Sequence, residues 1–136
     1  MSFVPAGRGW TTIKIPTKAN TTYLVNQMIY NDGTDNVPVT TTSQGNIVGI
    51  TKEAKTSAAN TNAISVLVPT SPASTFYGDM VSGETIAKTN EGAQYDFSST
   101  GVTISTTSTY DTVTLVKFLS TLKGVFKLNT TFGIEN

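Results

Sequence analysis

Apolar residues in this chain fall into short runs, separated by clusters of Gly, Asn, Asp and Ser about every 8–12 residues. This spacing is typical of a β-sandwich or β-barrel, and helical periodicity is scarce. The runs are rich in Val, Ile and Thr, which suit a pleated, half-buried surface. The pattern predicts an all-β fold. The expected strands are 10–15, 22–30, 37–42, 46–52, 63–68, 76–81, 84–88, 102–105, 112–119 and 124–129.

Period-two alternation assigns faces to two of these strands. In the strand 63–68, Ile64, Val66 and Val68 share one face, and Ser65 and Leu67 take the other. The strand 112–119 is apolar on both faces, so we expect it at a central position. A short connection then predicts that it pairs with the strand 124–129.

The chain length predicts one domain with its own hydrophobic core. No internal repeat is evident, and no linker is rich enough in Gly, Pro or Ser to divide the chain. At most one short helix is expected. It would cover 92–99, with Thr89 or Asn90 as its cap.

The composition removes most catalytic chemistry. The 136 residues contain no cysteine and no histidine, so disulfides, thiolate metal sites and Ser-His or Cys-His nucleophile pairs are excluded. Nine basic residues balance nine acidic ones, so no net field attracts nucleic acid or anionic lipid. No apolar stretch approaches the ~20 residues of a membrane helix. We expect no enzymatic activity, no cofactor, no metal, and neither a nucleic-acid nor a membrane partner.

Three polar motifs have ordinary structural explanations. The segment 31–36, "NDGTDN", faintly resembles a calcium loop, but it lacks the alternating acids and the closing Glu, and Asp-Gly favours a turn. The segment 7–10, "GRGW", lacks the frame of a phosphate-binding loop. Acidic residues fall almost entirely in turns, so we expect them to be solvated. Loss of an activity on changing Asp96 or Asp111 to Asn would overturn the non-enzyme interpretation.

The N-terminal segment allows two interpretations. Pro and Gly interrupt it, so it is no secretory signal. It could be an extended arm over 1–20 that leads into the first strand, with 21–136 forming the β-rich domain. Alternatively, 10–15 is simply the first core strand behind a frayed terminus. The residues that could anchor an arm are Phe3, Val4, Pro5, Arg8 and Trp10.

Five longer segments carry a resemblance to a known family. They are "TYLVNQMIYNDGT", "VPVTTTSQGNIVGITKEA" with its Val-Gly-Ile, "AISVLVPTSPASTFYGDM", "GAQYDFSSTGVTI" with a Gly-x-x-Tyr-Asp hairpin start, and "TVTLVKFLSTLKGVFKLN". In their order along the chain and in their residue composition they resemble the small capsid decoration (cement) proteins of tailed bacteriophages, of the β-tulip or lambda-type head-decoration family. The resemblance covers most of the chain.

This resemblance implies a compact β-barrel or β-tulip-like domain with an extended N-terminal segment. It also implies a homotrimer on the outer surface of the virion capsid that clamps neighbouring subunits of the major capsid protein. The N-terminal anchor residues would contact the capsid. The alternatives are a tail or head–tail structural protein, and a carbohydrate-binding or adhesin module that uses exposed Tyr and Trp side chains.

Low charge has one further consequence. Lys and Glu are the usual residues that keep strand edges from pairing with other chains. A chain with 13% charged residues therefore has weakly defended edges. Such edges can accept or donate a strand, with main-chain hydrogen bonds giving affinity.

Overall fold

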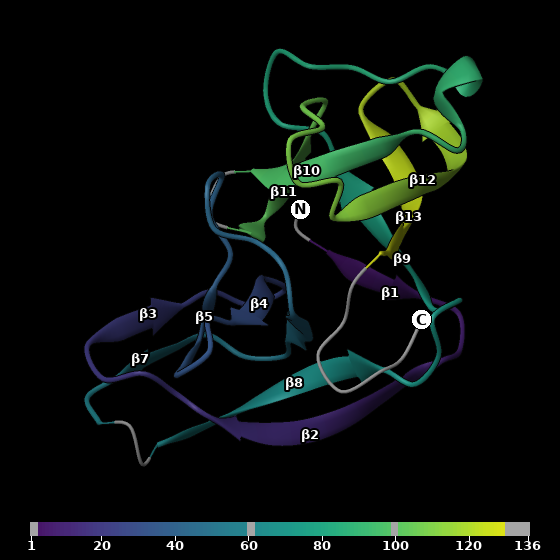
Figure 1. Ribbon diagram of the computed structural model, residues 1–136. Helices are drawn as coiled ribbons and strands as arrows, with labels where there is room; N and C mark the ends of the chain where they lie inside the picture. The colour runs from purple at the N-terminus through teal and green to yellow at the C-terminus, as the bar shows by residue number, and fades with distance from the viewer. Residues whose placement is uncertain (1–2, 60–61, 99–100, 130–136) are drawn as a thin grey trace.

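The computed structural model describes residues 3–59, 62–98 and 101–129, and within these the fold is almost entirely β (Figure 1). Every sheet is antiparallel. A six-stranded sheet has the order β1-β9-β13-β12-β10-β11, a five-stranded sheet the order β2-β8-β6-β4-β5, and β3 pairs with β7. The predicted all-β fold is confirmed.

The strand bounds are as follows. The six-stranded sheet contains β1 (Val4–Ala6), β9 (Thr75–Asp79), β10 (Gln94–Ser98), β11 (Thr103–Ser105), β12 (Val113–Ser120) and β13 (Lys123–Leu128). The five-stranded sheet contains β2 (Trp10–Pro16), β4 (Met28–Asn31), β5 (Asn36–Pro38), β6 (Ile47–Thr51) and β8 (Ala63–Pro69). The small sheet contains β3 (Thr21–Tyr23) and β7 (Lys55–Ser57).

The six-stranded sheet curls back on itself into a small barrel. Met80, just after β9, forms a parallel bridge with Ile104 of β11, and the Val81 N–H donates to the Ile104 carbonyl at 2.8 Å. This contact joins the last strand of the sheet to the second, so β9, β13, β12, β10 and β11 close around a core while β1 stays outside the ring. The contact covers the outer edge of β11, while β1 remains at the edge of the sheet.

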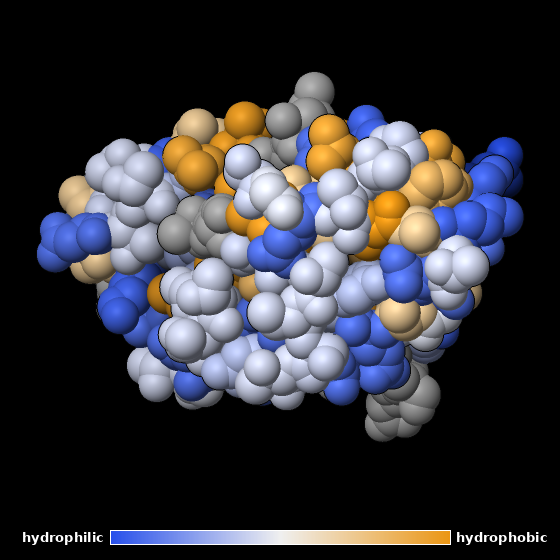
Figure 2. Space-filling view, turned by 90° about the horizontal axis from the view of Figure 1, so that it is seen from above, coloured by the Kyte–Doolittle hydropathy of each residue, from blue (hydrophilic) through white to orange (hydrophobic). Residues whose placement is uncertain are grey.

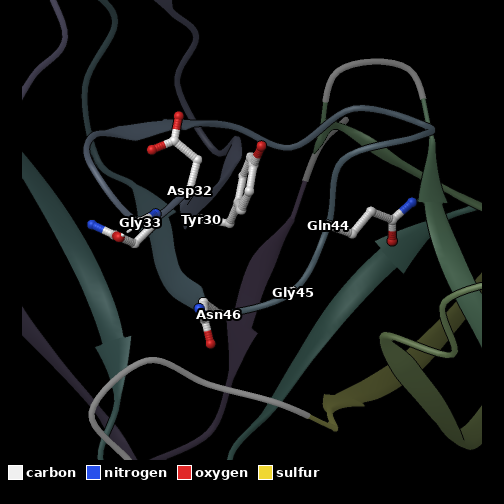
Figure 3. A pocket seen from close by; sticks show the side chains of 7 residues that line it. Tyr30, Asp32, Gly33, Gln44, Gly45 and Asn46 are labelled. Atoms are coloured by element: carbon white, nitrogen blue, oxygen red, sulfur yellow. Dashed lines mark hydrogen bonds between the residues drawn. The ribbon is translucent and has the colours of Figure 1, made fainter.

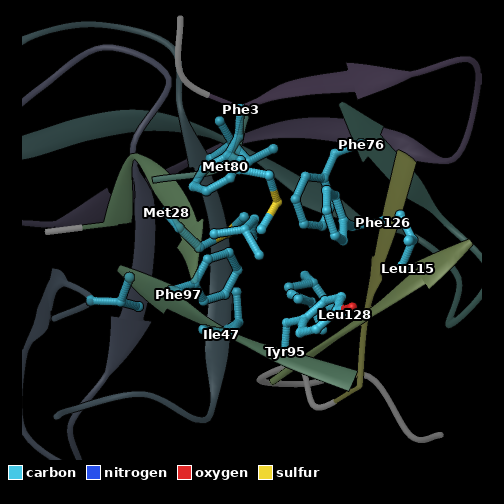
Figure 4. Close-up of a cluster of buried hydrophobic side chains, with 14 of the residues drawn as sticks. Phe3, Met28, Ile47, Phe76, Met80, Tyr95, Phe97, Leu115, Phe126 and Leu128 are labelled. Atoms are coloured by element: carbon cyan, nitrogen blue, oxygen red, sulfur yellow. The ribbon is translucent and has the colours of Figure 1, made fainter. Parts of the chain in front are cut away.

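The main core fills the barrel and extends to the five-stranded sheet (Figure 4). At its centre four Phe rings pack together. Phe3 lies edge-on to Phe76 and Phe97, with ring centroids 5.3 and 5.2 Å away, and Phe76 stacks on Phe126 at 6.0 Å. From the other sheet come fully buried Met28 and further aliphatic side chains. One core therefore serves both sheets.

A second, smaller core lies between the five-stranded sheet and the β3–β7 pair. It includes Ile64 and Val66, which confirms the face assigned to that strand. Its largest side chain is Tyr23, whose hydroxyl donates to the Asn36 carbonyl at 2.6 Å and accepts from the Lys18 N–H at 2.9 Å. Burial raises the pKa of this hydroxyl above its ordinary value. Its buried polar end is thus satisfied.

Three predicted strands differ from the observed ones. The expected strand 22–30 is broken by a turn around Asn26, which has φ 58°, and the expected strand 37–42 ends at Pro38. The segment 84–88 is not a strand. In each case a short apolar run suggested a strand. The backbone turns instead where turn-forming residues occur, and an apolar residue such as buried Ile86 packs into the core without belonging to a strand.

The predicted helix at 92–99 is wrong over 92–98, and residue 99 lies outside the described residues. Strand β10 lies there, because Tyr95 and Phe97 alternate into the barrel core. A single turn of 3-10 helix (η1, Lys88–Asn90) precedes it. The Asn90 amide oxygen accepts from the Ala87 N–H at 2.7 Å.

The hairpin of β12 and β13 is confirmed, and β12 lies inside the sheet between β13 and β10. The predicted central position of this strand is therefore confirmed, but not all of its apolar side chains are buried. Register shifts at Val116 and Leu119 interrupt the alternation, and these side chains are 44% and 42% exposed. The predicted turn at 31–36 is confirmed: Asp32 Oδ1 accepts from the Thr34 and Asp35 N–H groups at 2.9 and 2.7 Å.

Candidate interaction surface

The N-terminal segment is built into the sheets of the free chain. Phe3 is fully buried, and its N–H donates to the Asn26 carbonyl at 3.1 Å. Strand β1 pairs with β9, and β2 pairs with β8 over its whole length. Of the two interpretations, the geometry favours the first core strand. No break in the fold marks the boundary proposed at residue 20.

The other predicted anchor residues have separate environments. Pro5 is half-buried opposite Phe76, and Arg8 is exposed in the connection between β1 and β2. Trp10 is half-buried: its indole N–H donates to the Thr75 carbonyl at 2.9 Å, and its ring lies edge-on to Phe76. Phe3 and Trp10 thus flank the same core ring. Val4 points outward and is 37% exposed.

Val4 belongs to a row of side chains on the outside of the six-stranded sheet. Its cross-strand partner is Tyr77, which pairs in turn with Val125, which pairs with Lys117. Directly opposed residues of an antiparallel sheet project from the same face. These four residues are here called the outer row. Tyr77, 38% exposed, is its largest member.

Further apolar side chains lie on the β12–β13 hairpin that forms one end of the outer row. Val116 neighbours Lys117, while Leu119 and Leu122 are 42% and 56% exposed toward the turn. Figure 2, which views the barrel end, shows several apolar groups on one side of this face, separated by polar side chains, while the other side is mostly polar. Apolar surface grouped in this way is typical of interaction surfaces.

Sequence reasoning named Val4 but not the other members of the outer row. Tyr77 was missed because aromatic side chains in an all-β fold normally pack in the core. The available signal was the neighbouring pair Phe76–Tyr77. In a strand, adjacent side chains point to opposite faces, so one of the two had to point outward. The alternation alone did not say which.

Asp96 differs from the expectation that acidic residues lie in solvated turns. It is only 2% exposed, on the middle of β10. Oδ1 accepts from the Tyr110 and Asp111 N–H groups, both at 2.9 Å, and Oδ2 accepts from the Thr109 N–H and the Thr107 hydroxyl, both at 3.0 Å. All four bonds come from the loop between β11 and β12, so the carboxylate holds that loop against the barrel.

Glu84 holds the other side of the same loop. Its carboxylate accepts from the Thr106 hydroxyl and N–H and from the Ser105 hydroxyl. The Thr106 hydroxyl, followed by its N–H, lowers the pKa of Glu84 below the ordinary 4.5. The Glu84 carboxylate therefore binds a proton less readily in the folded chain than in the unfolded chain. Glu84 stabilises the fold above about pH 4.5, and this contribution is lost as the pH falls through the lowered pKa.

We therefore expect the gap in melting temperature between wild type and Glu84→Gln to depend on pH. The variant should melt lower at pH 7, and the gap should narrow below about pH 4.5 as the wild-type carboxylate takes up its proton. Thermal unfolding followed by circular dichroism from pH 3 to pH 7 measures this. All other carboxylates are the same in both proteins, so their titration affects both melting temperatures alike. A difference in melting temperature that stays constant over this range would show that the charge of Glu84 does not stabilise the fold.

A shallow depression of about 430 Å³ lies beside the turn after β4 (Figure 3). Its polar side chains do not converge: Asp32 and Asn46 point in different directions, and Gln44 points away from Tyr30. Gln44 also bonds both backbone groups of Phe97, at 2.8 and 2.9 Å. These groups serve the fold, and we assign no ligand to the depression.

Within residues 3–59, 62–98 and 101–129, no group of three or more Asp or Glu residues is placed to hold a metal ion. In the same part of the chain, no helix has the length and apolar character that crossing a membrane requires. Comparison with models of known protein families and with curated proteins gives no match. The relation to capsid decoration proteins therefore stays a prediction from the sequence.

Proposed function

We propose that this chain is a non-enzymatic virion structural protein that binds the outer surface of a phage capsid. It would stabilise the shell by clamping neighbouring subunits of the major capsid protein. The sequence resemblance supplies the partner. The observation that carries the proposal is the outer row, in which exposed Val4 and Tyr77, half-buried Val125 and exposed Lys117 lie side by side across four strands.

The outer row suits a binding role for physical reasons. Its residues project from a sheet that a packed core holds rigid, so little conformational entropy is lost when a partner covers them. Tyr77 offers a large apolar ring with a hydroxyl at its tip, a combination enriched at binding hot spots. Lys117 at one end adds a charge at the rim.

The N-terminal segment contributes to this surface in a different way from an extended arm. Val4 extends the outer row by one strand, and Arg8 is exposed in the following connection. Phe3, Pro5 and Trp10 support them from the core side. A trimer at a local three-fold position would present three such surfaces, and many bound copies would stabilise the assembled shell by mass action.

Binding to bare expanded shells of the parent phage tests the proposal. We expect Tyr77→Ser to weaken binding about tenfold or more, since a central aromatic contact is worth roughly 2 kcal/mol. Cosedimentation over a concentration series measures the affinity. Val25→Ser is the matched control: Val25 is 47% exposed, but it lies on the turn between β3 and β4, away from the outer row.

Equal binding by Tyr77→Ser and wild type would count against the outer row as the capsid contact. Deleting residues 1–9 is a poorer test, because it would also remove Phe3 from the core. A tail or head–tail protein would instead assemble into rings or tubes by itself and ignore shells. Electron microscopy of the parent particle would separate these roles.

A further inference from the structure

The edges of the sheets differ in how well they are protected. On the five-stranded sheet, β5 is short, ends in Pro38, and has its Asn36 carbonyl covered by the Tyr23 hydroxyl. Strand β1 has three residues and contains Pro5, which cannot donate a ladder hydrogen bond. Strand β2 is different. It has seven residues, most of them exposed, and no strand of the described chain pairs with its other side (Figure 1).

The backbone of β2 alternates between its partner and its open side. At the two ends of the ladder, the Thr70 N–H donates to the Gly9 carbonyl and the Thr17 N–H donates to the Asn62 carbonyl. In an antiparallel ladder every second residue exchanges such bonds. Odd-numbered residues of β2 therefore bond to β8. The N–H and carbonyl groups of Thr12 and Lys14 face outward.

The side chains beside this edge have two different characters. Lys14 lies in a cross-strand row with Ser65 and Lys52, because Lys14 pairs with Ser65 and the Lys52 N–H donates to the Ser65 carbonyl. The Lys52 ammonium also reaches the Thr12 hydroxyl at 3.3 Å. On the opposite face, Ile13 is 41% exposed beside fully buried Val66.

We propose that the open edge of β2 is a docking site for an extended polypeptide segment that adds to the five-stranded sheet as a further strand. The segment has acidic side chains on the face toward Lys14 and Lys52 and an aliphatic side chain on the face toward Ile13. Its backbone bonds to Thr12 and Lys14. This goes beyond the proposed capsid role, because it concerns a separate surface and needs no capsid.

Charge favours an acidic segment over a second copy. The Glu53 carboxylate, which accepts from the Ser65 N–H at 3.0 Å and interacts with Lys14, offsets only part of the positive charge of the two lysines. A second copy pairing through its own β2 would bring Lys14 and Lys52 of both copies onto one face, and like charges on neighbouring strands repel. Lysine on an edge strand commonly prevents such self-pairing. An acidic segment reverses the sign of the same interaction. The lysines therefore select the partner as well as exclude the copy.

Amide hydrogen exchange read by NMR tests this with defined probes. In the free chain at low concentration, the Thr12 and Lys14 amides should exchange fast, while those of Thr11, Ile13 and Ile15 are protected by β8. Adding the capped peptide Thr-Glu-Val-Glu-Val-Glu-Thr at saturation should slow exchange at Thr12 and Lys14 about tenfold. The same peptide with Lys in place of Glu should have no such effect.

Two variants isolate the two parts of the proposal. Thr12→Pro removes one outward N–H and leaves the bonds to β8 intact, so it should abolish peptide binding while the chain stays folded. Thr12→Val keeps the N–H and serves as its control. Lys14→Glu leaves the backbone unchanged and should weaken binding of the Glu peptide. This variant still tests the proposal if the proline variant unfolds.

Three results would overturn the proposal. The first is protection of the Thr12 and Lys14 amides in the free chain at every concentration, which means that the edge is already covered. The second is protection that rises with protein concentration without peptide, which identifies a second copy as the occupant. The third is equal binding of the Glu and Lys peptides. Because the outer row is a separate surface, capsid binding could persist in each of these cases. None of the three results would therefore count against the proposed function.

Discussion

Replacing Asp96 with alanine should lower the free energy of unfolding by about 3 kcal/mol, because four hydrogen bonds to one buried carboxylate are lost together. Three of the donors are backbone N–H groups, which cannot find another partner without moving the loop. Urea unfolding followed by fluorescence measures the loss. The loop from Thr106 to Tyr110 should also become sensitive to limited proteolysis.

Two further variants define the cause. Asp96→Asn keeps the volume and one acceptor oxygen but turns an NH₂ group toward backbone donors, so it should destabilise nearly as much as alanine. Asp35→Ala changes an acid whose carboxylate accepts no hydrogen bond from the described residues, and its effect should be within about 0.5 kcal/mol. A loss below about 1 kcal/mol for Asp96→Ala would show that the loop does not depend on the carboxylate.

Gly49→Ala should destabilise the chain by about 3 kcal/mol, at the upper end of the usual cost of overpacking. Gly49 lies in the middle of β6, whose five residues are all buried. A Cβ at this position would lie 2.1 Å from the Leu67 carbonyl oxygen and 3.2 Å from the Val68 Cα. Both are backbone atoms of β8, so two paired strands would have to separate. The melting temperature and the urea midpoint measure the effect.

Gly78→Ala is the matched control for this prediction. Gly78 is also a buried strand glycine, but the nearest atoms to an added Cβ are in the Phe126 and Phe3 rings, at 3.1 to 3.2 Å. Side chains yield more easily than a strand backbone, so the loss should be clearly smaller. If the two variants were equally destabilised, the close approach of β6 to β8 would not be what requires glycine at position 49.

The parts of the fold that the sequence predicted are those where local pattern and packing agree. The β12–β13 hairpin and the buried face of Ile64 and Val66 follow from alternation next to clear turn residues. The pattern could not predict that β10 replaces a helix, because Tyr95 and Phe97 find their place only when distant strands close the barrel. Tertiary contacts overrode a weak local preference there.

The candidate surface was predicted only in part. Val4 was named from the sequence and lies in the outer row, but Phe3, named for the same role, is buried in an aromatic cluster with Phe76 and Phe97. Hydrophobicity predicts that both side chains are buried, but it does not say whether the fold of the chain or a binding partner buries them. The pairing of β1 with β9 places Phe3 in the core and Val4 on the surface. This pairing joins segments that are far apart in the sequence, so local pattern does not predict it.

The position of Phe3 also constrains how the chain is made. The first side chain of the described fold packs against Phe76 and Phe97, and Phe76 in turn stacks on Phe126 of β13. During synthesis the earliest residues leave the ribosome well before these partners exist. The aromatic centre can close only after β9, β10 and β13 have all been synthesised, so folding is expected to be slow, as for other barrels dominated by distant pairings.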